Sequence, residues 1–214
     1  MKKTILIVFV ILVADQVLKF WIKTNMTLGQ EIHILGNWFI FHFTENEGMA
    51  FGITLGGATG KLLLSIFRII AVIIIGIYIY RLRKKSTHPG LVISFSLIMA
   101  GALGNILDSA FYGLIFSQSS YHTVATMFPP EGGYANFLHG KVVDMFYFPV
   151  IDTILPEWVP LRGGEQFIFF RPVFNIADAS ITTGVFMLLF FQKKFFEKQE
   201  TKAEPAQESE EASS

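Results

Sequence analysis

Residues 62–80 have the sequence LLLSIFRIIAVIIIGIYIY, in which Arg68 is the single charged residue. A helix that crosses the hydrocarbon core of a bilayer needs about 20 mainly apolar residues. The stretches 4–22, 91–107 and 173–191 have a similar length and composition. The chain of 214 residues is 52% apolar and 16% charged, with a mean hydropathy of +0.50, which is more apolar than an ordinary soluble domain. We predict an all-α integral membrane protein with four transmembrane helices.

The distribution of basic residues predicts which side of the membrane each loop occupies. Four spans put both termini on one side, and the short segments on that side carry eight basic residues: Lys2, Lys3, Arg81, Arg83, Lys84, Lys85, Lys193 and Lys194. The loops on the other side, 23–61 and 109–172, carry five. Lys and Arg accumulate in cytoplasmic loops. We therefore expect an N-in, C-in topology.

A cleaved signal peptide is the alternative interpretation of the first apolar stretch, because Lys2 and Lys3 precede it. Such a peptide ends at a small-x-small cleavage motif. Here the sequence continues as ADQVLKFW over residues 14–21, which keeps the apolar character beyond the expected cut. We expect 4–22 to remain as a membrane anchor.

The two outer loops have different compositions. In the first, residues 31–35 and 38–43 are rich in β-branched and aromatic residues around Gly36-Asn37, a pattern typical of a short hairpin. The second loop, 109–172, holds six of the eight prolines and many aromatic residues, which favour the headgroup region of a membrane. We expect a small β-rich element on the outer surface and a long aromatic loop, which together cover a site as a lid.

The composition also excludes several classes of function. The chain has no cysteine, so disulfides and thiol chemistry are absent. Seventeen basic and seventeen acidic residues leave no surplus of positive charge for nucleic acid. The five histidines lack the spacing of metal ligands, and no cofactor-binding motif is present, so we expect neither metal nor cofactor. Residues 197–214 contain six Glu and two Lys and are expected to be a disordered cytoplasmic tail outside a membrane domain of residues 1–196.

Charged residues inside the spans indicate where the chemistry lies. A charged side chain facing lipid is costly, so intramembrane charges usually serve a function or a partner. All five lie toward the outer ends of the predicted helices: Asp15, Lys19, Arg68, Asp108 and Asp178. Three asparagines join them from the same side: Asn46, Asn105 and Asn175. The sequence therefore predicts one polar site at the outer boundary of the membrane.

Asp178 and Asp144 are the candidate catalytic pair. Asp144 is flanked by apolar residues in GKVVDMF, residues 140–146, which would desolvate it. Two carboxylates held close in such a site share one proton and can act as general acid and general base on water. Membrane carboxylates also line proton and ion paths, so a transporter or channel remains an alternative, as does a non-catalytic scaffold. The transporter would place charges on both sides of the midplane, whereas these lie on the outer side.

Some of these residues also have a purely structural interpretation. Asp15 and Lys19 are spaced i,i+4, so they can neutralise each other on one helix face. Lys19 and Arg68 can extend their charged ends toward the interface. Gly101 and Gly104 are small residues that let helices approach closely.

Five blocks in chain order resemble lipoprotein signal peptidase, also called signal peptidase II. They are Asp15-x-x-x-Lys19, Asn46-x-Gly48-x-Ala50-Phe51, Gly101-Ala102-Leu103-Gly104-Asn105-x-x-Asp108, Gly140-x-Val142-Val143-Asp144 and Phe174-Asn175-x-Ala177-Asp178. The blocks extend across residues 1–196. Any one of them alone would be weak evidence, but their order within a four-span protein is specific.

The resemblance implies a bacterial inner-membrane aspartic endopeptidase. It would remove the signal peptide from prolipoproteins by cutting before the cysteine that carries a diacylglyceryl group, without metal or cofactor, at a site facing the outer leaflet. Asp144 and Asp178 match the catalytic pair. Residues matching substrate-binding or supporting positions are Asp15, Lys19, Asn46, Gly48, Asn105, Asp108, Asn175 and Ala177. Inhibition by the cyclic peptide globomycin and a monomeric state are further expectations.

The chain departs from the family pattern in two ways. The family commonly has Arg after the Asp that ends the third-span block, and this chain has Ser109. Arg68 and Arg171 are the candidates to replace that cation. The segments from Asp108 to Asp144, and from Asp144 onward to the last block, are longer than in compact members of the family.

Overall fold

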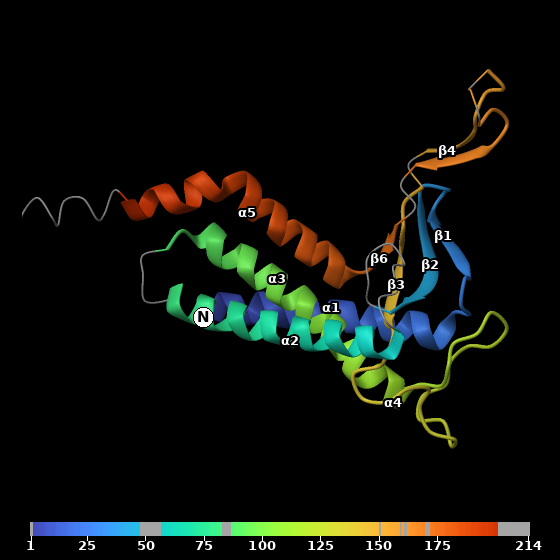
Figure 1. The fold of residues 1–214 in the computed structure, drawn as a ribbon, viewed down its shortest axis with the longest axis horizontal. Helices are drawn as coiled ribbons and strands as arrows, with labels where there is room; N and C mark the ends of the chain where they lie inside the picture. Colours follow the sequence, from blue (N-terminus) through green and yellow to red (C-terminus); the bar gives the residue numbers. More distant parts are fainter. Residues whose placement is uncertain are drawn as a thin grey trace, which may run out of the picture. The chain divides into compact units, whose positions relative to one another are not determined.

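The computed structural model describes residues 2–47, 57–82, 87–149, 151–158, 160, 162–169 and 172–200. Four long helices are present in this part of the chain: α1 (Lys2–Asn25), α2 (Gly57–Leu82), α3 (Pro89–Leu107) and α5 (Ile176–Glu200) (Figure 1). Three helical segments are long and apolar enough to cross a membrane, namely Lys2–Asn25, Thr59–Leu82 and Pro89–Ile115. The protein is therefore a mostly helical, multi-pass membrane protein.

The first three predicted spans lie inside α1, α2 and α3, and α3 ends at Leu107 as the sequence predicted, but the helical structure does not end there. After α3 the chain continues as the π-helix η2 (Asp108–Tyr112) and the short α4 (Gly113–Ile115). The expected start of the outer loop at residue 109 is thus wrong. Asp108, at the start of this extension, is buried and pairs with Lys19 inside the protein, so it does not face solvent as a residue at a helix end would.

The fourth predicted span, 173–191, begins too early. Val173 and Phe174 form strand β6 (Val173–Phe174), and helix α5 begins at Ile176. Helix α5 is not among the segments of the described chain that are apolar enough to span a membrane by composition. Its sequence, IADASITTGVFMLLFFQKKFFEKQE, has polar residues at both ends. A fourth span therefore stays a prediction.

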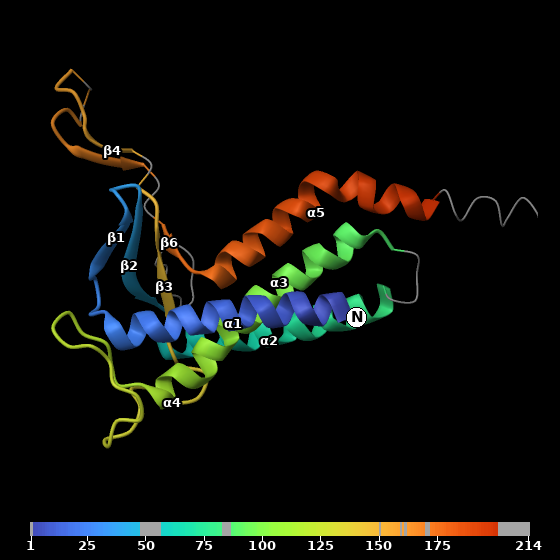
Figure 2. The ribbon, with the colours of Figure 1, turned by 180° about the vertical axis from the view of Figure 1, so that it is seen from behind.

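The predicted hairpin in the first loop is confirmed, and it forms one edge of a larger sheet. Strands β1 (Glu31–Leu35) and β2 (Phe39–Asn46) pair antiparallel, and β2 pairs with β3 (Val142–Tyr147) from the second loop. The sheet order is β1-β2-β3-β6, as Figure 2 shows from behind. The sequence did not predict β3, because its residues are apolar on both faces and show no alternation. A separate hairpin joins β4 (Ile151–Ile154) to β5 (Gln166–Phe169).

The described residues divide into two compact units. One contains residues from 1–16, 65–106 and 176–214, and we call it the helical unit. The other contains residues from 17–64 and 107–175, and we call it the sheet unit.

Small residues bring the helices of the helical unit close together. A Cβ added at Gly101 would lie 2.1 Å from the carbonyl oxygen of Ala177, so α3 and α5 touch at the level of their backbones. A Cβ added at Gly104 would lie 2.8 Å from Asp15 Oδ2. These approaches agree with the packing role predicted for the two glycines. At the other end of the helices, Leu82, Leu91 and Phe195 form a small buried cluster.

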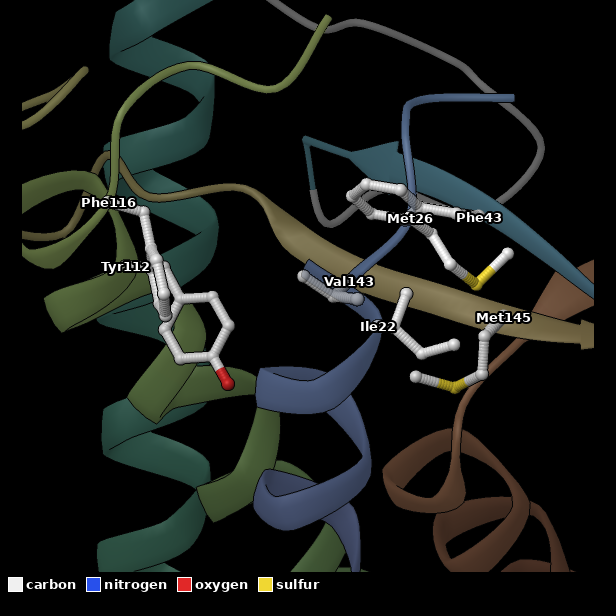
Figure 3. Packing of buried hydrophobic residues seen from close by; sticks show 7 residues of the cluster. All are labelled: Ile22, Met26, Phe43, Tyr112, Phe116, Val143 and Met145. Atoms are coloured by element: carbon white, nitrogen blue, oxygen red, sulfur yellow. The ribbon is translucent and has the colours of Figure 1, made fainter. Parts of the chain in front are cut away.

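The sheet unit has its own apolar core. Buried side chains from the end of α1, from β2, from the η2–α4 region and from β3 pack together (Figure 3): Ile22, Met26, Phe43, Tyr112, Phe116, Val143 and Met145. Full burial of such a side chain stabilises the fold by about 1.5–3 kcal/mol. This core fixes β3 against α1, and β3 is the strand that carries Asp144.

Candidate active site

Asp144 lies in the middle of β3 with its carboxylate held from both neighbouring strands. The side chain is 2% exposed. Asn46, the last residue of β2, donates from Nδ2 to Asp144 Oδ2 at 3.3 Å. Asn175, which directly follows β6, donates from Nδ2 to Asp144 Oδ1 at 2.6 Å and to the Val143 carbonyl at 3.2 Å. Two neutral amides therefore satisfy a buried carboxylate and orient it without adding charge.

A buried ion pair supports the strand beside Asp144. Lys19 Nζ lies 2.8 Å from Asp108 Oδ2, and neither side chain is exposed. The same Asp108 oxygen accepts a hydrogen bond from the backbone N–H of Val143 at 3.3 Å. Asp108 begins η2 and Lys19 lies on α1, so the pair ties two helical segments to the backbone of β3.

The chain enters β3 through a glycine that packs directly on η2. Gly140 donates its backbone N–H to the carbonyl of Ser109 at 2.8 Å. A Cβ at Gly140 would lie 2.3 Å from the carbonyl oxygen of Asp108. Ser109 itself is buried, so the position where the family commonly has Arg is here a small side chain inside the protein.

A second buried charged cluster was not predicted from the sequence. Lys23 pairs with the carboxylate of Glu45, and its ammonium donates to Ser119 Oγ at 2.9 Å. Ser119 Oγ donates to Glu45 Oε1 at 2.8 Å. The Lys23 ammonium also lies 4.9 Å from the centre of the Tyr134 ring. Glu45 directly precedes Asn46 on β2, so the cluster anchors the strand that delivers one donor to Asp144.

Lys23 and Glu45 look like ordinary loop charges in the sequence, which is why they were missed. The available signal was spacing, because Lys23 lies four residues after Lys19 and therefore on the same face of a helix. Burial of the Tyr134 phenol beside this cluster raises its pKa above the ordinary value. Tyr134 accepts a hydrogen bond from the backbone N–H of Lys141 at 2.6 Å, next to the start of β3.

In the helical unit, Asp178 lies in the first turn of α5 and is held by an asparagine of α3. Asn105 is 2% exposed and donates from Nδ2 to Asp178 Oδ1 at 2.8 Å. Asp15 is buried and accepts a hydrogen bond at Oδ1 from the backbone N–H of Ala177 at 2.9 Å. The first N–H groups of a helix have no partner within it, so Asp15 caps α5 directly beside Asp178.

The capping contact gives two predicted residues a more specific role. Ala177 takes part through its backbone N–H, and its side chain is fully buried. Gln16 donates to Asp15 Oδ2 at 3.2 Å and to the carbonyl of Gly104 at 3.3 Å, which links the cap to α3. From their spacing, the sequence predicted that Asp15 and Lys19 neutralise each other on one helix face. In the structure each has a partner from a distant segment: Lys19 pairs with Asp108, and Asp15 accepts from the N–H of Ala177.

The predicted site residues thus fall into two groups. The sheet unit brings together Lys19, Asn46, Asp108, Asp144 and Asn175. The helical unit brings together Asp15, Asn105, Ala177 and Asp178. Arg68 is half-buried on α2. Gly48, Ala50, Phe51 and Arg171 lie outside the described residues.

Apolar membrane helices combined with two aspartates, Asp144 and Asp178, that are each held by an asparagine amide define a multi-pass membrane protein with a polar carboxylate site. The sequence pattern of the family described as Signal peptidase (SPase) II matches residues 7–193. The chain belongs to this family, and it is a membrane protease that removes signal peptides from prolipoproteins.

Individual relatives agree with the family. A lipoprotein signal peptidase of Porphyromonas gingivalis is 52% identical over 187 residues, which cover 86% of this chain and 79% of the relative. One of Amoebophilus asiaticus is 41% identical over 180 residues, covering 83% and 72%. A solved structure described as a bacterial membrane enzyme at 2.3 Å resolution aligns with a TM-score of 0.59 and 25% identity, covering 91% of this chain and 89% of that one.

Proposed function

We propose that the protein is an aspartic endopeptidase that cuts diacylglyceryl-modified prolipoproteins just before the lipidated cysteine, with Asp144 and Asp178 as its acid and base. The observation that carries the proposal is that asparagine amides hold each of the two carboxylates by hydrogen bonds. Asp144 accepts hydrogen bonds from Asn46 and Asn175, and Asp178 accepts one from Asn105. Ionisable residues at membrane depth usually serve a function, and supporting hydrogen bonds that fix the side chain are what a catalytic group needs.

The chemistry follows from two carboxylates that share one proton. The ionised aspartate removes a proton from water, and the resulting hydroxide attacks the carbonyl carbon of the scissile peptide bond. The protonated aspartate donates to the developing oxyanion and then protonates the leaving amine. Because the two groups titrate as a pair, the acid and base roles belong to the pair rather than to one residue.

The proposal includes a topology. Helix α5 is the fourth span, both termini are cytoplasmic, and the site faces the outer leaflet of the bacterial inner membrane. Exposed apolar side chains along α5 support a lipid-facing helix: Val185, Phe186, Leu189, Phe190 and Phe191. Lys193 and Lys194 follow them, as expected for a cytoplasmic end. A substrate that carries a diacylglyceryl group can then reach the site laterally through the bilayer.

The outer elements complete the proposal. The β1–β2 hairpin and the segments between residues 109 and 172 cover the site as a lid and limit access of bulk water. The protein works as a monomer without metal or cofactor and is inhibited by globomycin. Deletion of the β4–β5 hairpin tests the lid: if cleavage and inhibitor binding are unchanged, this hairpin has no part in it.

The decisive experiment is cleavage of a diacylglyceryl-modified prolipoprotein by the purified protein in detergent, with a chelator present throughout. We expect Asp144→Asn and Asp178→Asn each to lower turnover by about 10²–10⁴-fold or more, since each removes an acid or base. Glu200→Gln, at the end of α5 and outside the matching blocks, is the control and should retain activity. Wild-type rates in both test variants would disprove the dyad. Activity that disappears with chelator would disprove the metal-free mechanism.

The transporter interpretation predicts a different outcome. In it the same carboxylates carry protons, and Asp15→Asn or Asp108→Asn would abolish proton flux in reconstituted vesicles. We expect no flux from wild-type protein in vesicles where the prolipoprotein is cleaved.

A further inference from the structure

The loop that follows α4 exposes large apolar side chains instead of burying them. Phe128 is 70% exposed and Phe137 is 53% exposed. Both lie in the sheet unit and outside its buried apolar core. Exposed aromatic clusters on a protein surface usually mark a contact with a partner or a membrane.

This exposed surface is continuous with the end of a membrane-capable helix. The segment Pro89–Ile115 is apolar enough to span a bilayer, and Phe111 and Leu114 in its last turns are 44% and 46% exposed. The rings of Phe111 and Phe137 contact each other, with centroids 6.0 Å apart. The backbone N–H of Phe128 donates to the carbonyl of Ile115 at 2.7 Å. We call the four side chains Phe111, Leu114, Phe128 and Phe137 the aromatic collar.

The loop backbone is held firmly in the conformation that presents the collar. Phe116 and Met127 form a β-bridge, and Ala135 donates its N–H to the carbonyl of Gly113 at 3.0 Å. Phe128 and Leu138 have φ angles of 48° and 66°, a region that side chains of this size rarely adopt. An unfavourable conformation persists only where surrounding contacts enforce it. The outward position of Phe128 is therefore fixed by the contacts of the loop.

The charge of the loop indicates which kind of partner fits. Residues 116–140 contain one carboxylate, Glu131, and no Lys or Arg. A surface that binds anionic headgroups or an acidic protein by charge would carry basic residues. Aromatic rings at the end of a spanning helix are typical of the boundary between headgroups and acyl chains.

We propose that the aromatic collar is a lipid-contact surface, in which Phe128 and Phe137 insert into the bilayer at the headgroup boundary beside the end of the α3–α4 helix. The binding is apolar, so it depends on the presence of a bilayer and not on anionic lipid. The collar lies outside the matching family blocks and outside the residues of the proposed dyad. It anchors the second outer loop to the membrane surface at the level where that loop leaves the span.

The chain has no native cysteine, so single-cysteine labelling can test the proposal directly. Phe128→Cys and Phe137→Cys are each labelled with an environment-sensitive fluorophore in the full chain, reconstituted in phosphatidylcholine nanodiscs. His122→Cys is the matched control, because His122 is exposed in a polar turn of the same loop. Cleavage of prolipoprotein in detergent verifies that each labelled protein is folded.

We expect blue-shifted emission at positions 128 and 137, with most of the emission lost when the lipids carry a nitroxide near the headgroup. The fluorophore at position 122 should instead be quenched by aqueous iodide. Adding phosphatidylglycerol to the lipids should change the emission at none of the three positions. Iodide quenching at positions 128 and 137 equal to that at 122 would overturn the proposal. Shielding from both iodide and lipid nitroxide would also overturn it, since a protein surface would then cover the collar.

Discussion

The helical unit and the sheet unit each hold an aspartate through an asparagine amide, but they use different scaffolds. In the helical unit, Asn105 of α3 reaches Asp178 in the first turn of α5, and the aspartate stays partly exposed. In the sheet unit, Asp144 is buried and is held by residues at the ends of both flanking strands. The hydrogen bond to Asp178 joins two helices, α3 and α5. The hydrogen bonds to Asp144 join three segments that are distant in the chain: the end of β2, the middle of β3 and the residue after β6.

The comparison shows where each site is vulnerable. The helical unit relies on close backbone approach, so added volume should damage it most. The sheet unit relies on buried charged groups whose protein partners replace water. The loss of one such partner should therefore destabilise this unit most. The four predictions below test this difference, from the largest expected effect to the smallest.

The largest effect should come from breaking the buried ion pair of the sheet unit. Lys19→Met leaves the Asp108 carboxylate buried without its cation, and removal of one partner of such a pair typically costs about 3–5 kcal/mol. Unfolding measured in detergent should show this loss. The double variant Lys19→Met/Asp108→Leu should recover a large part of it, because neither member of the pair then leaves an uncompensated charge.

The control for this prediction is an ion pair that reaches solvent. Lys61 Nζ lies 2.7 Å from Glu47 Oε2, and the Glu47 side chain is 43% exposed. Lys61→Met leaves behind only the Glu47 carboxylate, which reaches solvent, and should change the free energy of unfolding by no more than about 1 kcal/mol. An equal loss of free energy of unfolding at the two ion pairs would show that burial of the remaining charged group does not determine the size of the loss.

The next effect should come from added volume in the helical unit. Gly101→Ala places a methyl group against the carbonyl of Ala177 and should cost about 1–3 kcal/mol, since the backbone cannot yield without moving α5. Activity should fall as well, because Ala177 shares the first turn of α5 with Asp178. Gly76→Ala on α2 is the matched control. A Cβ there meets no atom within 4 Å, so this variant should be neutral or more stable by up to about 1 kcal/mol.

The two asparagine donors allow a direct comparison of the sites. Asn175→Ala should slow cleavage more than Asn105→Ala, because Asn175 satisfies the Val143 carbonyl as well as the buried Asp144 carboxylate. A lost hydrogen bond to a buried charged group costs about 1–3 kcal/mol, or roughly 10–100-fold in turnover. We expect the change in kcat rather than in KM. The reverse order would mean that the partly exposed Asp178 depends more on its amide partner than the buried Asp144 does.

The smallest effect should be a change in the pH dependence of stability, through one tyrosine of the sheet unit. Burial raises the pKa of Tyr134 above the ordinary value of 10.0. Above that pH the unfolded chain loses the phenolic proton while the folded chain keeps it, so stability decreases as pH rises. Tyr134→Phe should remove this decrease between pH 10 and 11. It should also lose some stability at neutral pH, because the Lys141 N–H loses its acceptor. Identical slopes in wild type and variant would contradict the assignment.

Local patterns predicted some elements well. The apolar stretches predicted α1, α2 and α3, and the β-branched run around Gly36-Asn37 predicted the β1–β2 hairpin. The pairing of β3 with β2 was not predictable, because α2, α3, η2, α4 and a long loop all lie between Thr44 and Asp144 in the sequence. The extension of α3 through η2 was missed since a lone Asp108 looks like a helix end until its partners are known.

The sequence by itself determined that the chain is a membrane protein, which residue types carry its chemistry and which family it resembles. These conclusions rest on apolar length and on the order of short motifs, both of which are local properties. Only the tertiary structure decided the partners: Asp108 for Lys19, Asn175 for Asp144, the α5 cap for Asp15 and Glu45 for Lys23. Each of these contacts joins segments far apart in the chain, so it forms only when buried polar groups must satisfy one another in a packed interior.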